Sequence, residues 1–304
     1  MSQQCASLQS PIDLGEGLTL VYQNPKAFSR YYAIYYAQKY ADYFFKSSPE
    51  ASIEIATAFD CGYLIVKDGM PIGGVFLKPN FMADFFLVPP FEDYEGLLHK
   101  LLRHVRKISK AEEKIFLREI VEEHVLAYKE KGCRIHEVNY WMIRPTESLK
   151  VTLPEGYRSR SVSYDDIHGI ASLLLKSYKA NPAYKNIGTK EAYADHVMEF
   201  IEKYQHNHTM DQCSRVIIDQ RNGAIVGVCL HMEFEGYPLI MSLAVDPDHQ
   251  RNGLGRYLLT HSINASSKKY PATRLSVIKD NAAIKLYEDL GFIRNRSLTD
   301  MYVV

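Results

Sequence analysis

The stretch "DPDHQRNGLGRY", residues 246–257, decides how this chain is interpreted. Its glycines, Gly253 and Gly255, follow a polar run and precede an apolar helical pattern that begins with Leu258 and Leu259. A glycine turn at a helix start predicts an anion site, because free backbone N–H groups and the helix dipole point the same way. The identity of that anion is the question that the rest of the sequence must answer.

The common phosphate loops do not match this stretch. A Walker loop requires Lys followed by Ser or Thr after its last glycine, and here Arg256 and Tyr257 follow. A dinucleotide loop requires a third glycine, at the position of Leu258. The sequence therefore predicts an anion site of another class.

Composition limits the function classes further. The chain has 304 residues, 46% hydrophobic and 24% charged, which is typical of a globular protein with two domains. Lys+Arg and Asp+Glu balance at 36 each, so neither a nucleic-acid nor a membrane partner is expected. Five cysteines form no C-x-x-C pair, and the amino terminus has no basic start followed by an apolar core. These features predict reduced thiols and a cytoplasmic location.

Hydrophobic periodicity predicts a mixed α/β second half. Asn222-Gly223 is a strong hairpin signal between two apolar runs. We expect strands over 157–162, 215–219, 224–232, 238–245 and 273–278 and a final strand to 304, with helices over 164–178, 191–204, 253–268 and 281–290.

The first half repeats this order. "VPPFEDYEGLLHKLL" (88–102) aligns without a gap with "VDPDHQRNGLGRYLL" (245–259), and "AYKEKGCR" (127–134) aligns with "LYEDLGFI" (286–293). Matched order and matched turns favour a duplication. We therefore predict two domains, 1–148 and 149–304, divided at the proline-containing segment near residue 150.

The run Gln250-Arg251-Asn252-Gly253-Leu254-Gly255 resembles the Q/R-x-x-G-x-G/A signature of the GNAT superfamily of acyl-CoA-dependent N-acetyltransferases. The preceding "LAVDP" and the later "AIKLYEDLGF" resemble that family's central strand and last helix. The resemblance implies two tandem GNAT-like domains, each a mostly antiparallel, splayed sheet flanked by helices. It also implies that the co-substrate is acetyl-CoA, with no metal ion. The residues expected to bind it are Leu243, Ala244, Val245, Gln250, Arg251, Asn252, Gly253, Leu254, Gly255, Arg256 and Asn281.

Transfer of an acetyl group to an amine requires a neutral amine, a stabilised oxyanion and a proton for the departing thiolate. Tyr287 matches the family's tyrosine acid. The predicted strand 238–245 has no ionisable side chain, so His231 and Glu233 on the neighbouring strand, with Glu235, are the candidate bases. The acceptor is expected to be an amine of a small molecule or a peptide. The missing strand carboxylate keeps a second hypothesis open, a non-catalytic acetyl-CoA-binding or sensing module.

The first half retains the spacing of the motif but not the residues that would bind an anion. Leu98 stands where the second half has Gly255, and Asp93 and Tyr94 replace Gln250 and Arg251. We therefore predict a degenerate domain that shapes the substrate pocket or replaces a homodimer partner. The sequence does not choose between a monomer and a homodimer.

Three further patterns have alternative explanations. His206, His208 and Cys213 are a conceivable metal set, but a polar loop is favoured. Lys268 and Lys269 could form a 3′-phosphate clamp, but a solvated helix end is favoured. A tyrosine stripe on a predicted helix 28–45 is expected to pack between the halves or under the first sheet, or to line a pocket. The stripe consists of Tyr31, Tyr32, Tyr35, Tyr36, Tyr40 and Tyr43.

Overall fold

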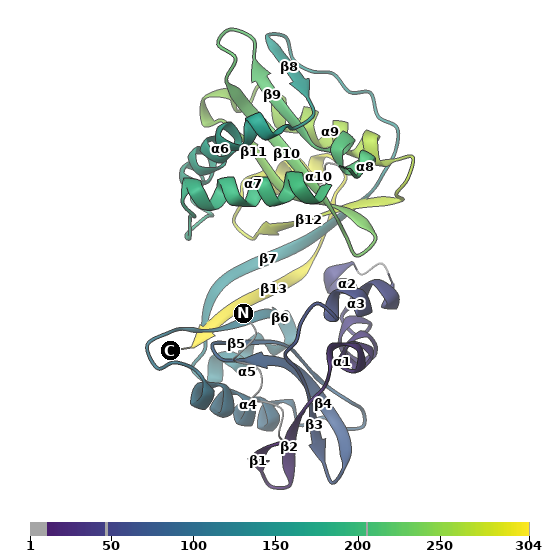
Figure 1. The fold of residues 1–304 in the computed structure, drawn as a ribbon, viewed down its shortest axis with the longest axis vertical. Coiled ribbons are helices and arrows are strands. Elements are labelled where there is room, and N and C mark those ends of the chain that lie inside the picture. The colour runs from purple at the N-terminus through teal and green to yellow at the C-terminus, as the bar shows by residue number, and fades with distance from the viewer. Residues whose placement is uncertain (1–10, 46–47, 205, 304) are drawn as a thin grey trace. The chain divides into compact units, whose positions relative to one another are not determined.

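A computed structural model describes residues 11–45, 48–204 and 206–303. The chain forms two compact units. Described residues up to Asn139 and from Asn295 onward form the first unit, and Tyr140–Arg294 form the second. Each unit is a mixed, mostly antiparallel sheet flanked by helices, so the predicted fold class is confirmed (Figure 1). No helix in these described ranges is long and apolar enough to cross a membrane.

The sheet of the first unit has the strand order β1-β2-β3-β4-β5-β6-β13. All neighbours are antiparallel except β5 and β6, which pair in parallel. The elements before β7 are β1 (Ile12–Gly15), β2 (Leu18–Tyr22), α1 (Pro25–Tyr32), the π-helix η2 (Ala33–Ala37), α2 (Ala41–Phe44), α3 (Pro49–Ala56), β3 (Gly62–Lys67), β4 (Met70–Lys78), β5 (Phe81–Leu87), α4 (Tyr94–Ile108), β6 (Ile115–Val121), the 3₁₀-helix η3 (Glu122–His124) and α5 (Val125–Glu130).

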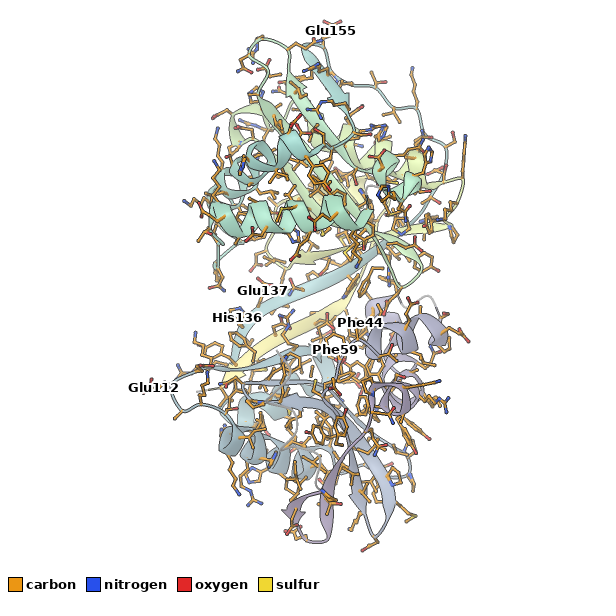
Figure 2. All side chains as sticks on the ribbon, in the orientation of Figure 1. Phe44, Phe59, Glu112, His136, Glu137 and Glu155 are labelled. Carbon is orange, nitrogen blue, oxygen red and sulfur yellow. The ribbon has the colours of Figure 1, made fainter. Side chains whose placement is uncertain are left out.

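The tyrosine stripe packs under the sheet of its own unit. The single predicted helix 28–45 is broken into α1, η2 and α2, so that part of the prediction is wrong. The ring of Phe28 lies 4.7 Å from that of Phe76 on β4, and Tyr36, Tyr40 and Tyr43 are buried. Phe44, labelled in Figure 2, is buried with them. The aromatic surface is therefore covered within the first unit.

The second unit has the strand order β12-β11-β10-β9-β8, with β7 (Arg134–Pro145) next to β12. One hydrophobic core lies against α9 and α10, and another against α6 and α7, on the opposite face. The elements are β8 (Tyr157–Arg160), η4 (Tyr164–Asp166), α6 (Ile167–Ala180), α7 (Lys190–Tyr204), α8 (His208–Cys213), β9 (Arg215–Asp219), β10 (Ile225–Phe234), β11 (Tyr237–Val245), η5 (Pro247–His249), α9 (Leu254–Ser266), β12 (Ala272–Ile278) and α10 (Ala283–Asp289).

The last strand of each sequence repeat belongs mainly to the compact unit formed by the other repeat. Residues from Tyr140 to the end of β7 belong to the second unit, whose core includes Met142. Most of β13 (Ile293–Val303) belongs to the first unit, where it pairs with β6 and contributes Met301 to the core. The predicted division at residues 148 and 149 follows the repeat along the sequence. The compact units differ from it because each repeat supplies its final strand to the other unit.

The conceivable metal set does not converge. The predicted polar loop contains a short helix, α8, with His208 exposed at its start and Cys213 buried at its end. The Cys213 Sγ lies 3.8 Å from the Ser262 carbonyl oxygen. Within residues 11–45, 48–204 and 206–303, no group of three or more His, Cys, Asp or Glu side chains is arranged to hold a metal ion.

Candidate functional site

A gap opens in the second sheet between β11 and β12. These parallel strands pair only at Leu239 with Arg274 and at Ile240 with Leu275, and no later residues of the two strands pair. On the other side of β11, Leu230 pairs with Ser242 and His231 with Ile240, which leaves Met241 as the extra residue of a β-bulge. The bulge lies where the two parallel strands separate.

Backbone groups of β11 face this gap. The Asp246 N–H donates to the Val226 carbonyl across the β10 pairing (2.9 Å), and the register continues unshifted back to Ser242. Because hydrogen-bonding direction alternates along a strand, Leu243 and Val245 direct their N–H and C=O groups away from β10 and into the gap. The Val245 carbonyl accepts bonds from Ser177 Oγ (3.2 Å) and Gln250 Nε2 (3.2 Å). The Val245 N–H and both groups of Leu243 are therefore the ones placed to pair with an extended ligand.

The glycine turn joins β11 to α9. Gly253 adopts φ +80° and precedes the first residue of α9, and Arg251 adopts φ 63°, a left-handed conformation that non-glycine residues rarely take. At Gly255, a Cβ atom would lie 3.2 Å from Leu286 Cδ2 and 3.9 Å from Val245 Cγ2. The missing side chain therefore keeps space open between the end of β11 and α10, beside the unpaired N–H groups at the start of α9.

The gap and the turn line one cavity of about 580 Å³, which lies entirely within the second unit. Of the residues predicted to bind acetyl-CoA, only Asn252 is outside its lining, and the Asn252 side chain donates to the His249 carbonyl (3.3 Å). The predicted residues that line the cavity, with Tyr287, are Leu243, Ala244, Val245, Gln250, Arg251, Gly253, Leu254, Gly255, Arg256 and Asn281.

The electrostatics of the cavity favour an anion. Arg251 and Arg256 are the charged side chains among its described lining residues. The nearby carboxylates of Asp246 and Asp248 both pair with Lys176 Nζ, at 2.7 and 2.6 Å. Lys176 thus offsets part of the negative charge before the turn, and positive charge and helix N–H groups remain at the glycine end.

Tyr287 lies on α10 and lines the same cavity as the turn residues that begin α9. It is 7% exposed, and burial raises its pKa far above the ordinary tyrosine value, with neighbouring Tyr184, Cys229 and Tyr178 adding to the shift. The hydroxyl therefore stays protonated at neutral pH. A protonated hydroxyl beside the strand gap is placed to donate a proton rather than to accept one.

The structure does not bring the predicted bases to the cavity. His231 is fully buried on β10, with its Nε2 2.5 Å from Ser262 Oγ of α9, and burial lowers its pKa to about 3. The Glu233 carboxylate accepts from the hydroxyl of Tyr270 (2.6 Å), and Glu235 pairs with buried Arg274 (3.0 Å). No carboxylate or imidazole occurs among the described residues that line the cavity, so the geometry does not support His231 or Glu233 as a base.

Sequence reasoning missed the contribution of α6. Its last residues and the loop that follows line the cavity with Ser177, Tyr178, Asn181, Pro182 and Tyr184. The rings of Tyr178 and Tyr184 stack with their centroids 4.4 Å apart. The run "SYKANPAY" (177–184) contained a signal, two tyrosines around an Asn-Pro helix end, but no motif spacing connected it to the glycine turn.

The corresponding place in the first unit is filled by aromatic side chains. There β5 and β6 pair in parallel and diverge as β11 and β12 do, but the space left is only about 10 Å³. Tyr94, at the position of Arg251, stacks on His124 with ring centroids 3.7 Å apart, and its hydroxyl lies 3.4 Å from that of Tyr128. Leu98, at the position of Gly255, is fully buried. The first unit thus has the strand geometry without a comparable cavity.

Comparison with known proteins connects this geometry to a family. Residues 182–300 match the family model described as "Acetyltransferase (GNAT) domain". The [Ribosomal protein bS18]-alanine N-acetyltransferase of Escherichia coli K12 is 43% identical over 74 residues, 24% of this chain and 50% of that protein. Its counterpart from Salmonella typhimurium LT2 is 51% identical over 55 residues, 17% of this chain and 37% of the relative. The chain thus matches half or less of the length of these curated relatives.

Solved structures resemble almost the whole chain. A GCN5-related N-acetyltransferase from Sphaerobacter thermophilus superposes with a TM-score of 0.71 at 18% identity, covering 96% of each chain. A tandem GNAT protein from the clavulanic acid biosynthesis pathway superposes with a TM-score of 0.63 at 13% identity, covering 94% of this chain and 97% of that one. At these identities the likeness shows a shared fold.

Proposed function

Because residues 182–300 match the model of the GNAT acetyltransferase domain, we propose that the chain transfers the acetyl group of acetyl-CoA to a primary amine of a small molecule or a peptide. The observation that supports this function best is the convergence on one cavity of the β11 edge, the glycine turn and Tyr287. The N–H groups of the turn, with Arg251 and Arg256, suit a pyrophosphate. The Leu243 edge suits the amides of a pantetheine arm, which would lie in the gap as an added strand does.

The proposed reaction is direct attack of the amine nitrogen on the thioester carbonyl. The new C–N bond forms, the C–S bond breaks, and the amine releases a proton to water. A backbone N–H of β11 near Leu243 would stabilise the oxyanion. Tyr287, which is protonated at neutral pH, would donate its proton to the departing thiolate and regain one from water.

The described lining of the cavity favours an acceptor amine that is already neutral at the working pH and needs no general base. Its charged side chains are both arginines, so no lining group is suited to take a proton from an ammonium ion. An α-amino group has a pKa of about 7.7–8.0, whereas a lysine side chain has about 10.4, so a far larger fraction of an α-amine is neutral near pH 7. The curated relatives are named as alanine N-acetyltransferases. We therefore include an amino-terminal alanine peptide as the first acceptor to test.

The proposal places the protein in the cytoplasm, as a monomer or a homodimer.

Calorimetric titration with acetyl-CoA and detection of free thiol with a panel of amines test the proposal. We expect one equivalent bound per chain and thiol release that depends on an amine. Gly255→Leu, which copies Leu98 of the first unit, should abolish binding because its side chain enters the cavity beside Leu286. The control Ser172→Leu places the same side chain on the exposed side of α6 and should bind normally.

Two other results would change the conclusion. Binding of two equivalents would contradict the degenerate first unit. Binding without turnover across the panel would favour the alternative, a non-catalytic acetyl-CoA-binding or sensing module.

A further inference from the structure

The end of α6 is attached to three different parts of the cavity wall. Lys176 pairs with Asp246 and Asp248 before the glycine turn, and Ser177 Oγ donates to the Val245 carbonyl at the end of β11. Asn181, the residue that caps the carboxyl end of α6, reaches the third part, the start of α10. A helix tied to the turn and the strand holds its own last residue in a defined place relative to the cavity.

Asn181 and Asn281 form a side-chain bridge from α6 to α10. The Asn181 Nδ2 donates to Asn281 Oδ1 (3.2 Å). Each asparagine also accepts from a backbone N–H two residues further along, Ala183 N at 3.1 Å and Ala283 N at 2.9 Å. Because a backbone N–H can only donate, these two bonds define which end of each amide is the oxygen. The bridge therefore runs from the Asn181 amide nitrogen to an Asn281 oxygen with two donors.

The bridge determines where the remaining Asn281 donors point. Asn281 is 7% exposed and lines the cavity. Its backbone is also engaged, since its N–H donates to the Ile278 carbonyl (3.0 Å) and its carbonyl accepts from Ile284 N–H (3.1 Å). With its Oδ1 held by Asn181 and Ala283, the amide cannot rotate without losing two bonds. Its Nδ2 is therefore held on the opposite side as a donor for a carbonyl oxygen.

We propose that Asn181 is a positioning residue for acyl-CoA binding, acting through the Asn181–Asn281 bridge. It holds the Asn281 amide in the orientation in which Nδ2 donates to a carbonyl oxygen of the pantetheine arm. The inference rests on the proposed function, because that arm is part of the acetyl-CoA assigned to the cavity. Asn181 itself makes no bond to the ligand in this proposal, and its effect passes entirely through Asn281.

A double-mutant cycle on acetyl-CoA affinity tests the bridge. The variants are Asn181→Ser, Asn281→Ala and the double variant, each titrated calorimetrically in the full-length chain. Serine retains an oxygen for the Ala183 N–H but is too short to reach Asn281. A neutral hydrogen bond is worth about two- to tenfold in affinity. We expect Asn181→Ser to weaken binding by about three- to tenfold, with kcat at saturating acetyl-CoA changed less than about twofold. The double variant should bind no more weakly than Asn281→Ala alone.

Asn222→Ser is the matched control. Asn222 forms the same local bond, accepting from Ala224 N–H (2.9 Å), but in an exposed turn that does not line the cavity. It should leave acetyl-CoA affinity unchanged. If Asn181→Ser fails to fold, Asn181→Asp replaces it, because a carboxylate keeps the bond from Ala183 N–H but has no donor for Asn281.

The outcomes separate the inference from the function on which it rests. Wild-type binding with unchanged affinity in Asn181→Ser overturns the bridge alone. Additive losses in the double variant also overturn it, because Asn181 would then act by another route. A wild-type chain that binds no acetyl-CoA overturns the proposed function and the positioning role together.

Discussion

Replacing Arg251 with asparagine should stabilise the ligand-free protein and at the same time weaken its binding of acetyl-CoA. Arg251 adopts φ 63° in the turn before α9 and lines the cavity. A left-handed conformation costs a residue with an ordinary side chain about 1–2 kcal/mol, and asparagine adopts it more readily. The strain at this position is of the kind retained where it orients a functional group.

The magnitudes follow from this geometry. If asparagine recovers about half of the conformational cost, the free energy of unfolding rises by about 0.5–1 kcal/mol. For a unit of this size, that corresponds to a thermal midpoint about 1–4 °C higher. Arg251 is exposed, so solvent screens its contact with a phosphate, and we take the contact as about 1–2 kcal/mol. Affinity for acetyl-CoA should then fall about five- to thirtyfold.

Thermal denaturation without ligand and calorimetric titration with acetyl-CoA measure the two effects. Arg256→Asn is the matched control, since Arg256 also lines the cavity but lies within α9, where its conformation is helical. The control should lose affinity without gaining stability. A lower ligand-free midpoint for Arg251→Asn would refute the strain argument, and unchanged affinity would remove Arg251 from the phosphate site.

Three further predictions follow from other parts of the structure. Tyr287→Phe should lower kcat by about ten- to a thousandfold with little change in acetyl-CoA affinity, and full kcat in a chemistry-limited assay would exclude it as the acid. Burial lowers the pKa of His231 from 6.5 to about 3, so the unfolded chain takes up its proton first and stability falls as pH decreases from 6.5 to 3. In His231→Gln, the free energy of unfolding should depend less steeply on pH over that range, by up to about 1.4 kcal/mol per pH unit. Denaturation curves at a series of pH values measure this, and an unchanged slope would contradict the prediction. A fragment 134–294 should melt higher than a fragment 150–304, which lacks β7 and its buried core residue Met142, whereas equal midpoints would mean that β13 replaces β7 without loss.

The site was predictable where its chemistry is local in sequence. The glycine turn, the strand before it and Tyr287 lie within about fifty residues, and ten of the eleven predicted acetyl-CoA residues line the cavity. Gly253 and Gly255 carry a direct physical signal, because a left-handed φ and a missing Cβ are properties that few other residues supply. The aligned repeat similarly predicted two units of the same architecture.

The candidate bases could not be judged from sequence. His231 and Glu233 are two residues apart on β10, so the pattern places both on one face of the strand but does not indicate what covers that face. The packing of Ser262 against His231, and the bond from the Tyr270 hydroxyl to Glu233, come from residues distant in the chain. For the same reason, the sequence could not decide which part of the structure covers the tyrosine stripe.

By itself, therefore, the sequence determined the glycine turn, the order of the elements and the duplication, because each depends on backbone conformation or periodicity within a short segment. Only the tertiary structure decided that β7 and β13 are exchanged between the units, that Tyr94 fills the first gap and that Asn181 reaches Asn281. An apolar strand pattern shows that a strand has a buried face. It does not show which sheet edge the strand joins, because every edge with unpaired N–H and C=O groups can accept a strand equally. The choice of partner rests on contacts between residues far apart in sequence, and these exist only once the chain has folded.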